Sequence, residues 1–161
     1  MNFSVCPAVP EDAQAIADLN ESCFGHSCSR STVERLLSAV LDIRDERVLV
    51  AVYRGTMIGY VHVRTDRRTY RAPHKQIVSI AVDKNHRRKG VATALFRAVE
   101  ELAAEDGCKA ITAMVGGSHA AQAFFAAVQC EEQLNQKPYY KSMLQPKSPF
   151  IERLEQHGKK D

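Results

Sequence analysis

A basic segment that ends in a glycine and continues into small residues is the part of this chain best suited to chemistry. It contains Arg87, Arg88 and Lys89, followed by Gly90 and Ala92. The first amides of a helix have no intrahelical partner, and the helix dipole adds partial positive charge at that end. Gly90 and Ala92 leave room for a bulky anion, and the basic side chains add full positive charge. The segment therefore predicts a phosphate or pyrophosphate site at a helix N-terminus.

The spacing separates this segment from two familiar phosphate loops. Neither G-x-x-x-x-G-K-[ST] nor G-x-G-x-x-G occurs, which excludes a Walker A loop and the dinucleotide fingerprint. The pattern is Arg87-x-x-Gly90-x-Ala92, preceded by the apolar run 80–82 and followed by an amphipathic stretch. It resembles the [RQ]-x-x-G-x-[GA] acyl-CoA pyrophosphate loop of the GNAT N-acetyltransferase superfamily. A solvated basic turn that caps a helix is the alternative, and the flanking apolar run and helix disfavour it.

Length and composition narrow the class of protein. A chain of 161 residues suits one domain, and 45% apolar with 25% charged residues is typical of a globular protein. A net charge of +3 without interleaved aromatic residues does not favour nucleic acid as a partner. No apolar run is long enough to span a membrane and no signal peptide is evident, so we expect a cytoplasmic protein without a membrane partner. Five scattered cysteines predict reduced thiols and no metal site.

Hydrophobic periodicity and turn residues predict alternating strands and helices. The expected elements are a strand at 3–5, a helix from Pro10 to Gly25, a helix from Ser31 or Thr32, a strand pair at 47–53 and 57–64, a basic loop at 65–74, a central strand at 76–82, a helix from Gly90 to Asp106, a strand at 108–115, a helix from Ser118 to Val128, a last strand at 138–144 and a short helix at 150–157. This order predicts one α/β domain over residues 1–145, followed by a C-terminal tail at 146–161.

The same order resembles the GNAT fold over residues 3–144. The resemblance implies a central mixed, mostly antiparallel sheet that is splayed at the acyl-CoA site and flanked by helices. It implies acetyl-CoA as the cofactor, with the pantetheine arm along Ile80, Ala81 and Val82, bound through the backbone of Ile80 and Val82. It also implies a pyrophosphate site, made largely of backbone amides, from Arg87 to Thr93. That site comprises Arg87, Arg88, Lys89, Gly90, Val91, Ala92 and Thr93.

A later helix carries two departures from the family pattern near the cofactor. Ser118 stands where the family usually has asparagine, and Phe125 stands where a tyrosine often protonates the leaving thiolate. The resemblance therefore places Ser118 and Phe125 at the cofactor, but without a phenol at the second position. The acid is then expected from Tyr140 or Tyr139 on the last strand, since a phenol can protonate a thiolate, or from Ser118 through water. Strand alternation allows only one of the two tyrosines to face the site, and we favour Tyr140.

The position that often carries a glutamate base aligns with Gln76, and an amide is not a base. Gln76 can orient water or the acceptor amine instead. His74, two residues earlier, and His62, on the preceding strand, are candidate bases because imidazole titrates near neutrality. The alternative for both is an ordinary strand-end or surface histidine. By resemblance, the Val82 N–H is the donor to the developing oxyanion.

The leading hypothesis is an N-acetyltransferase that moves an acetyl group from acetyl-CoA to a primary amine of a small molecule or peptide, by direct attack in a ternary complex. The basic stretch 64–75 favours an acceptor with a carboxylate or phosphate. The alternative is a non-catalytic acyl-CoA-binding sensor, because Gln76 and Phe125 remove titratable groups from two positions. The sequence leaves a homodimer open, through strand edges or the tail.

Overall fold

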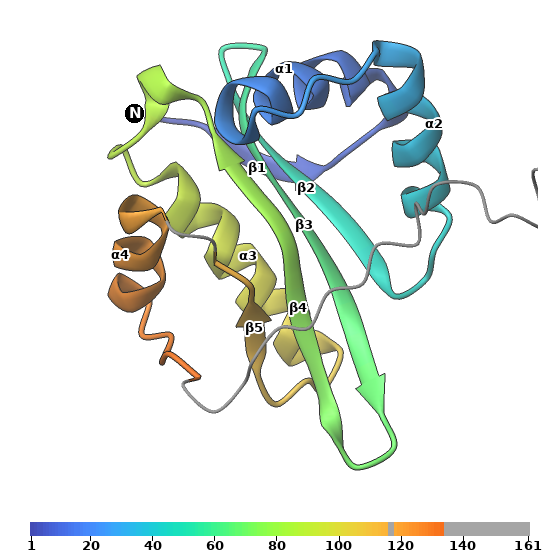
Figure 1. Ribbon diagram of the computed structural model, residues 1–161, viewed down its shortest axis with the longest axis vertical. Helices are drawn as coiled ribbons and strands as arrows, with labels where there is room; N and C mark the ends of the chain where they lie inside the picture. The colour runs from blue at the N-terminus through green and yellow to red at the C-terminus, as the bar shows by residue number, and fades with distance from the viewer. Residues whose placement is uncertain (116–117, 134–161) are drawn as a thin grey trace, which may run out of the picture. The chain divides into compact units, whose positions relative to one another are not determined.

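The computed structural model describes residues 1–115 and 118–133 (Figure 1). In chain order the elements are β1 (Ser4–Pro7), the 3-10 turn η1 (Pro10–Asp12), α1 (Ala13–Phe24), α2 (Arg30–Leu41), β2 (Glu46–Tyr53), β3 (Thr56–Arg68), β4 (Arg71–Val82), the 3-10 turn η2 (Lys84–His86), α3 (Val91–Glu105), β5 (Ile111–Ala113) and α4 (His119–Ala127). The chain divides into two units, of which the first ends at Phe124 and the second begins at Phe125. The fold and the candidate site below belong to the first unit.

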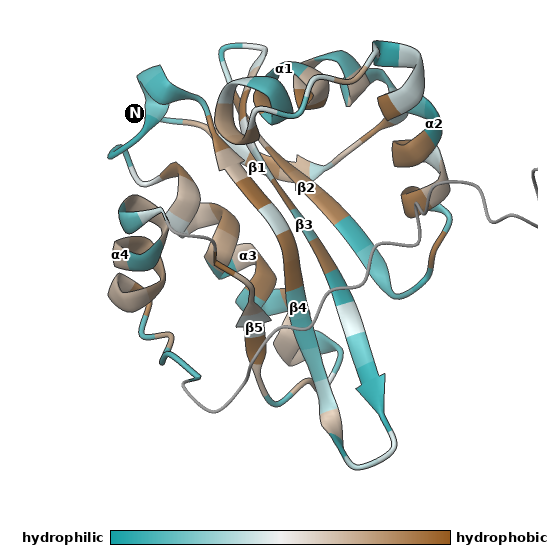
Figure 2. Cartoon of the chain, viewed as in Figure 1, coloured by the Kyte–Doolittle hydropathy of each residue, from teal (hydrophilic) through white to brown (hydrophobic). Residues whose placement is uncertain are grey.

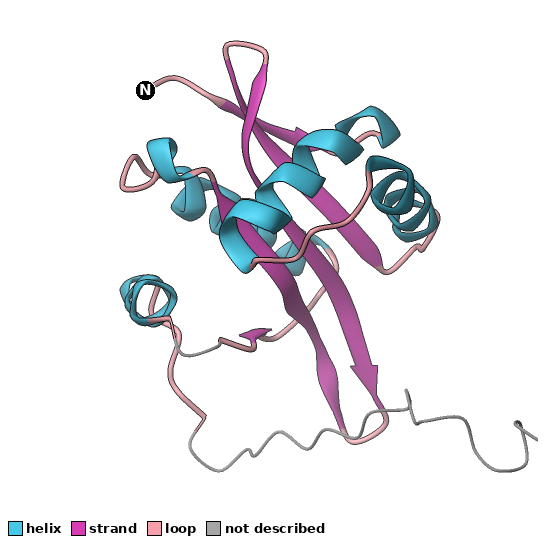
Figure 3. Cartoon of the chain, turned by 45° about the horizontal axis from the view of Figure 1, so that its top comes forward, coloured by secondary structure: helices cyan, strands magenta, loops and turns pink. Residues whose placement is uncertain are grey.

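One mixed sheet organises the first unit, with strands in the order β1-β2-β3-β4-β5. The first four strands pair antiparallel, and β5 pairs parallel with β4. Helices α1 and α2 cover one face of the sheet and α3 covers the other (Figures 1 and 3). This confirms the predicted α/β architecture with a mixed, mostly antiparallel sheet between helices.

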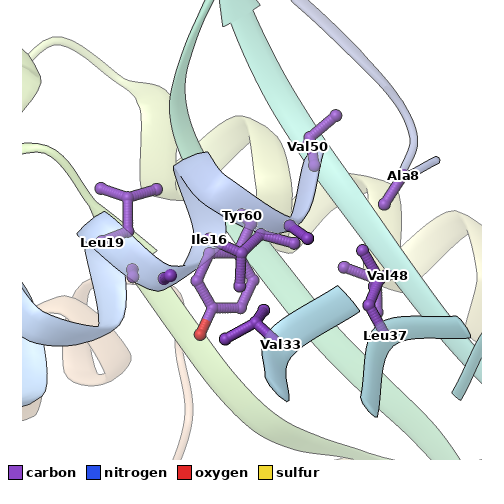
Figure 4. Packing of buried hydrophobic residues seen from close by; sticks show 11 residues of the cluster. Ala8, Ile16, Leu19, Val33, Leu37, Val48, Val50 and Tyr60 are labelled. Atoms are coloured by element: carbon purple, nitrogen blue, oxygen red, sulfur yellow. The ribbon is translucent and has the colours of Figure 1, made fainter. Parts of the chain in front are cut away.

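The core under α1 and α2 comes from alternating strand residues that meet the apolar faces of both helices. Val50, Tyr60 and Ala81 are neighbours across the ladder, so their side chains share one face. Figure 4 shows Ile16 and Val33 of the helices gathered with Tyr60. The cluster comprises Ala8, Ala13, Ile16, Ala17, Leu19, Val33, Leu37, Val48, Val50, Tyr60 and Ala81. This packing fixes α1 above the end of β4.

The helix ends follow the expected capping chemistry, with one correction. Gly25 ends α1 in the left-handed region, at φ 72°, as the sequence predicts. Helix α2 begins at Arg30, earlier than the predicted Ser31 or Thr32. The reason is that Ser29 is the N-cap: its Oγ accepts from the Thr32 amide at 3.2 Å.

The predicted basic loop at 65–74 is wrong, because these residues extend β3 and β4 into a long hairpin that turns at 69–70. Asp66 pairs with His74, and Arg68 with Arg71, across the ladder. Much of this hairpin is hydrophilic (Figure 2). High charge in the sequence predicts a loop, whereas a solvent-exposed two-stranded ribbon needs no apolar alternation once its backbone groups are paired.

The region after α3 contains a shorter strand than predicted. Strand β5 covers only Ile111–Ala113 instead of 108–115. The predicted last strand at 138–144 and the helix at 150–157 lie outside the described residues. Within the described part of the chain, no helix is both long and apolar enough to cross a membrane.

Candidate functional site

The site begins where β4 and β5 separate. Their ladder pairs Lys75 with Ile111, Gln76 with Thr112 and Ile77 with Ala113, and it ends there. Strand β4 continues for five more residues, to Val82. Beyond Ile77, that edge of β4 therefore has no strand partner among the described residues. This is the splay that the sequence predicts.

The register determines which peptide groups face the open edge. Asp83 N donates to Ile58 O at 2.9 Å, and Val82 lies opposite Gly59. Because bonded and non-bonded pairs alternate in an antiparallel ladder, the N–H and C=O groups of Ile80 and Val82 point away from β3. Those of Ala81 point toward β3. The open edge thus offers peptide groups at alternate residues, as expected for Ile80 and Val82 but not for Ala81.

A β-bulge lies at the point of separation. Val63 pairs with Ile77 and His62 with Ser79, which leaves Val78 as an extra residue in β4. Val78 is exposed, although it is apolar. A bulge bends its strand and increases the local twist. It therefore accompanies the turn of β4 away from β5.

The chain leads from this edge into the N-terminus of α3. The amides of Val91, Ala92 and Thr93 have no hydrogen-bond partner within residues 1–115 and 118–133, and no side chain caps the helix. Gly90 adopts φ 83°, and a Cβ placed on it would meet nothing within 4 Å. Arg88 is also left-handed, at φ 60°, which is uncommon for a residue with a side chain. The backbone here forms an open, donor-lined concavity suited to an anion.

Side chains around this concavity fix the loop. Arg87 Nε donates to Val82 O at 3.1 Å, and Cys23 Sγ contacts the same oxygen at 3.5 Å. The Asp83 carboxylate accepts from His86 Nδ1 at 2.7 Å, and this bond holds the pKa of Asp83 below its usual value. Lys89 Nζ donates to Asn85 O at 2.7 Å. Two cations of the loop are thus partly engaged with backbone oxygens.

Gln76 and His74 lie on the same face of β4, and His74, the candidate base of the two, is not placed to act as one. Gln76 Oε1 accepts from Arg64 Nε at 2.8 Å. His74 is only 3% exposed, and Arg71 Nη2 donates to its Nε2 at 2.7 Å. Burial and the adjacent Arg71 guanidinium lower the pKa of His74. A substrate therefore has little access to this imidazole.

His62 has a different environment that sequence reasoning missed in part. Its Nε2 lies 2.6 Å from Oε2 of Glu46, a residue just before the predicted strand at 47–53. The two side chains are 18% and 19% exposed. Glu46 aligns directly with Arg64, two residues from His62, so the hairpin register was the signal that could have found this pair.

Four further predicted residues lie at the start of α4, on it or beyond it. Ser118 caps the helix, and its Oγ accepts from the Ala121 amide at 3.4 Å, as the sequence predicts. Phe125 belongs to the same helix and is the first residue of the second unit. Tyr139 and Tyr140 lie outside the described residues.

A splayed strand pair that leads into an uncapped helix N-terminus is the arrangement that the resemblance to the acyl-CoA pyrophosphate loop implies. The chain matches the acetyltransferase (GNAT) family over residues 13–129. It therefore belongs to this family and is an acetyl-CoA-dependent acyltransferase. The comparison with curated proteins found no match.

Solved structures share the fold at low sequence identity. A putative acetyltransferase from Agrobacterium tumefaciens str. C58 is 16% identical with a TM-score of 0.77, and the match covers 86% of this chain and 99% of that one. A transcriptional regulator from Bacillus halodurans C-125 is 15% identical with a TM-score of 0.77, covering 88% and 100%. AAC(6')-Iy, in complex with the bisubstrate analogue CoA-S-monomethyl-acetylneamine, is 17% identical with a TM-score of 0.76, covering 88% and 99%.

Proposed function

We propose that this chain transfers the acetyl group of acetyl-CoA to a primary amine of a small molecule or peptide, by direct attack in a ternary complex. One observation carries the proposal. The unpaired edge of β4 at Ile80 and Val82 runs directly into the unpartnered amides at the start of α3. A pantetheine arm that ends in a pyrophosphate needs this sequence of strand-like donors and acceptors followed by an anion site.

The residues present fit the cofactor. Val91, Ala92 and Thr93 would bind the pyrophosphate through their amides, beside the open space at Gly90. The Arg88 side chain has no ion pair or hydrogen bond in the described part of the chain, which leaves it available to a phosphate. The peptide groups of Ile80 and Val82 would align the pantetheine arm and polarise the carbonyl, with the Val82 N–H as the oxyanion donor. Acetyl-CoA supplies an acetyl group activated as a thioester.

The acceptor amine and the acid complete the proposed reaction. Tyr140 is our candidate acid for the leaving thiolate, with Tyr139, or Ser118 through water, as alternatives. The charge of the hairpin does not favour an anionic acceptor, because its cations are largely paired within the first unit. Arg67 bonds Asp45, Arg68 bonds Asp66, and Lys75 bonds Asp106. The acceptor class therefore stays a primary amine.

Calorimetric titration with acetyl-CoA, followed by thiol release against an amine library, tests the function. Binding with turnover on any amine supports the transferase. Binding without turnover across chemically diverse amines favours the sensor alternative. The observation that supports this alternative is the 2.8 Å hydrogen bond from Arg64 to Gln76, which engages the side chain at the position that often carries a base. No binding of acetyl-CoA contradicts both.

Gly90→Glu and its matched control Gly90→Ala test the anion site. Both variants place a side chain at φ 83°, which costs about 1–2 kcal/mol, so they share the backbone strain. Only glutamate adds a carboxylate beside the donor amides. Since a hydrogen bond to a charged group contributes about 1.5–3 kcal/mol, we expect Gly90→Glu to weaken CoA binding about a hundredfold more than Gly90→Ala. Equal CoA dissociation constants for the two folded variants would contradict the proposed anion site.

A further inference from the structure

The pair formed by Glu46 and His62 is the best-defined imidazole–carboxylate contact on the α1–α2 face of the sheet. The 2.6 Å contact joins β2 to β3, and each side chain is about one-fifth exposed. The described residues contain two further such pairs, Asp83 with His86 in the loop that precedes the anion site, and Asp66 with His74 at 3.4 Å. His74, the other candidate base, is buried.

The contact determines which nitrogen of His62 is available. Nε2 carries the proton that it donates to the Glu46 carboxylate, so Nδ1 holds the lone pair. No hydrogen-bond partner of Nδ1 occurs in the described part of the chain. A carboxylate in this position orients the ring and stabilises the imidazolium when Nδ1 takes a proton. The pair therefore has the form of a general base with its orienting group.

His62 also lies close to the open edge of β4. It pairs with Ser79, the residue before Ile80, so one strand separates it from the unpaired peptide groups. Adjacent strands are about 4.8 Å apart, so His62 lies one strand spacing from the backbone of β4, whose far edge is open. His74, by contrast, lies six residues from Ile80, or about 20 Å along a strand.

The neighbours of His62 on this face contribute few charges. Glu46 faces it from β2, while Tyr60 and Arg64 flank it on β3. Strand β4 contributes the neutral side chains Gln76 and Ser79, and α1 contributes Asn20, which accepts from the Tyr60 hydroxyl at 2.5 Å. Arg64 donates to Gln76, so Glu46 is the only ion-pair partner of His62 in the described part of the chain.

We propose that His62 is the general base of the acetyl transfer and that Glu46 is its positioning residue. This inference rests on the proposed function. The acceptor ammonium gives one proton to His62 Nδ1, directly or through water. The amine lone pair then forms the C–N bond to the acetyl carbon while the C–S bond breaks. The second amine proton goes to the thiolate through the acid, and His62 returns its proton to solvent. The products are the amide, the CoA thiol and one released proton.

His62→Gln and Glu46→Gln test the assignment through the pH dependence of kcat at saturating acceptor, which reports groups in the bound complex. We expect His62→Gln to lower kcat by about a hundredfold or more and to abolish the wild-type acidic limb, with CoA affinity unchanged. Glu46→Gln should lower kcat less than His62→Gln does, because the imidazole remains but loses the carboxylate that orients its ring. The double variant should match His62→Gln, since Glu46 acts through His62.

Glu100→Gln, an exposed carboxylate on α3, is the matched control and should keep the wild-type profile. A His62→Gln variant that retains the acidic limb, or kcat within about threefold, overturns the assignment. If His62→Gln does not fold, a folded Glu46→Gln variant with the wild-type kcat overturns it instead. A wild-type protein that binds acetyl-CoA without turnover contradicts the transferase itself, which distinguishes failure of the function from failure of this base.

Discussion

Gly59 of β3 lies against both β4 and the start of α3, and Gly59→Ala tests this close approach. An added Cβ would lie 2.8 Å from Ala81 O, 3.3 Å from Val82 Cγ2 and 3.3 Å from Val91 Cγ1. The shortest contact is to the backbone of β4, which cannot rotate away. Strand β4 or the start of α3 must therefore shift, and these are the elements that carry the Val82 and Val91 amides.

The magnitude follows from two opposing terms. Overpacking by one methyl group costs about 1–3 kcal/mol, whereas alanine reduces the freedom of the unfolded chain and recovers about 0.4–1 kcal/mol. The free energy of unfolding should fall by about 1–2 kcal/mol, which lowers Tm by about 2–8 °C in a protein of this size. Loss of one well-aligned amide contact, at about 1 kcal/mol, should also weaken CoA binding about fivefold.

Thermal melts and CoA calorimetry of Gly59→Ala should be compared with Gly55→Ala. Gly55 lies in the turn between β2 and β3 at φ 77°, with nothing within 4 Å of an added Cβ. Its substitution costs about 1 kcal/mol through the left-handed backbone alone and should leave CoA affinity unchanged. A Gly59→Ala variant with wild-type Tm and wild-type CoA affinity would refute the close approach.

Two further variants test the framework of the site. Lys75 Nζ donates to Asp106 Oδ2 at 2.5 Å, and this bond holds the pKa of Asp106 below 3.8. The bond therefore stabilises the folded protein above the unfolded pKa of the carboxyl group, and this stabilisation is lost as the pH falls below about 4. Lys75→Met should therefore lower Tm at pH 7 and flatten the acid loss of Tm; melting curves parallel to wild type across pH would contradict this. Deletion of Val78 removes the bulge but preserves every β3–β4 pair, so the protein should fold while the straightened β4 binds CoA more weakly. Unchanged CoA affinity in the folded deletion variant would show that the open edge of β4 does not need the bulge to bind CoA.

The cofactor end of the site could be predicted from sequence because its determinants are local. A left-handed glycine, a helix start without a capping side chain, and a preceding apolar strand all lie within residues 80–93. The order of elements followed from periodicity in the same way. The roles of the Ile80 and Val82 peptide groups came from the family resemblance, and their alternate exposure agrees with a strand period of two residues.

The catalytic face could not be predicted as well, because it depends on register between distant segments. Glu46 and His62 are 16 residues apart, and only the β2–β3 ladder brings them to 2.6 Å. The charged ends of β3 and β4 were interpreted as a loop because exposed strands carry no apolar alternation. The Val78 bulge left no signal in composition, since an exposed valine in a strand resembles a core residue.

The two halves of this site are therefore specified by different physics. The proposed cofactor site uses backbone groups that become available because β5 is short and α3 has no cap, so many side chains are compatible with it. Proton transfer needs particular side chains on a half-exposed strand face, where packing imposes little. A base at His62 on β3 fits this requirement. Gln76 can stand on β4 in place of a titratable group because the neighbouring strand supplies one.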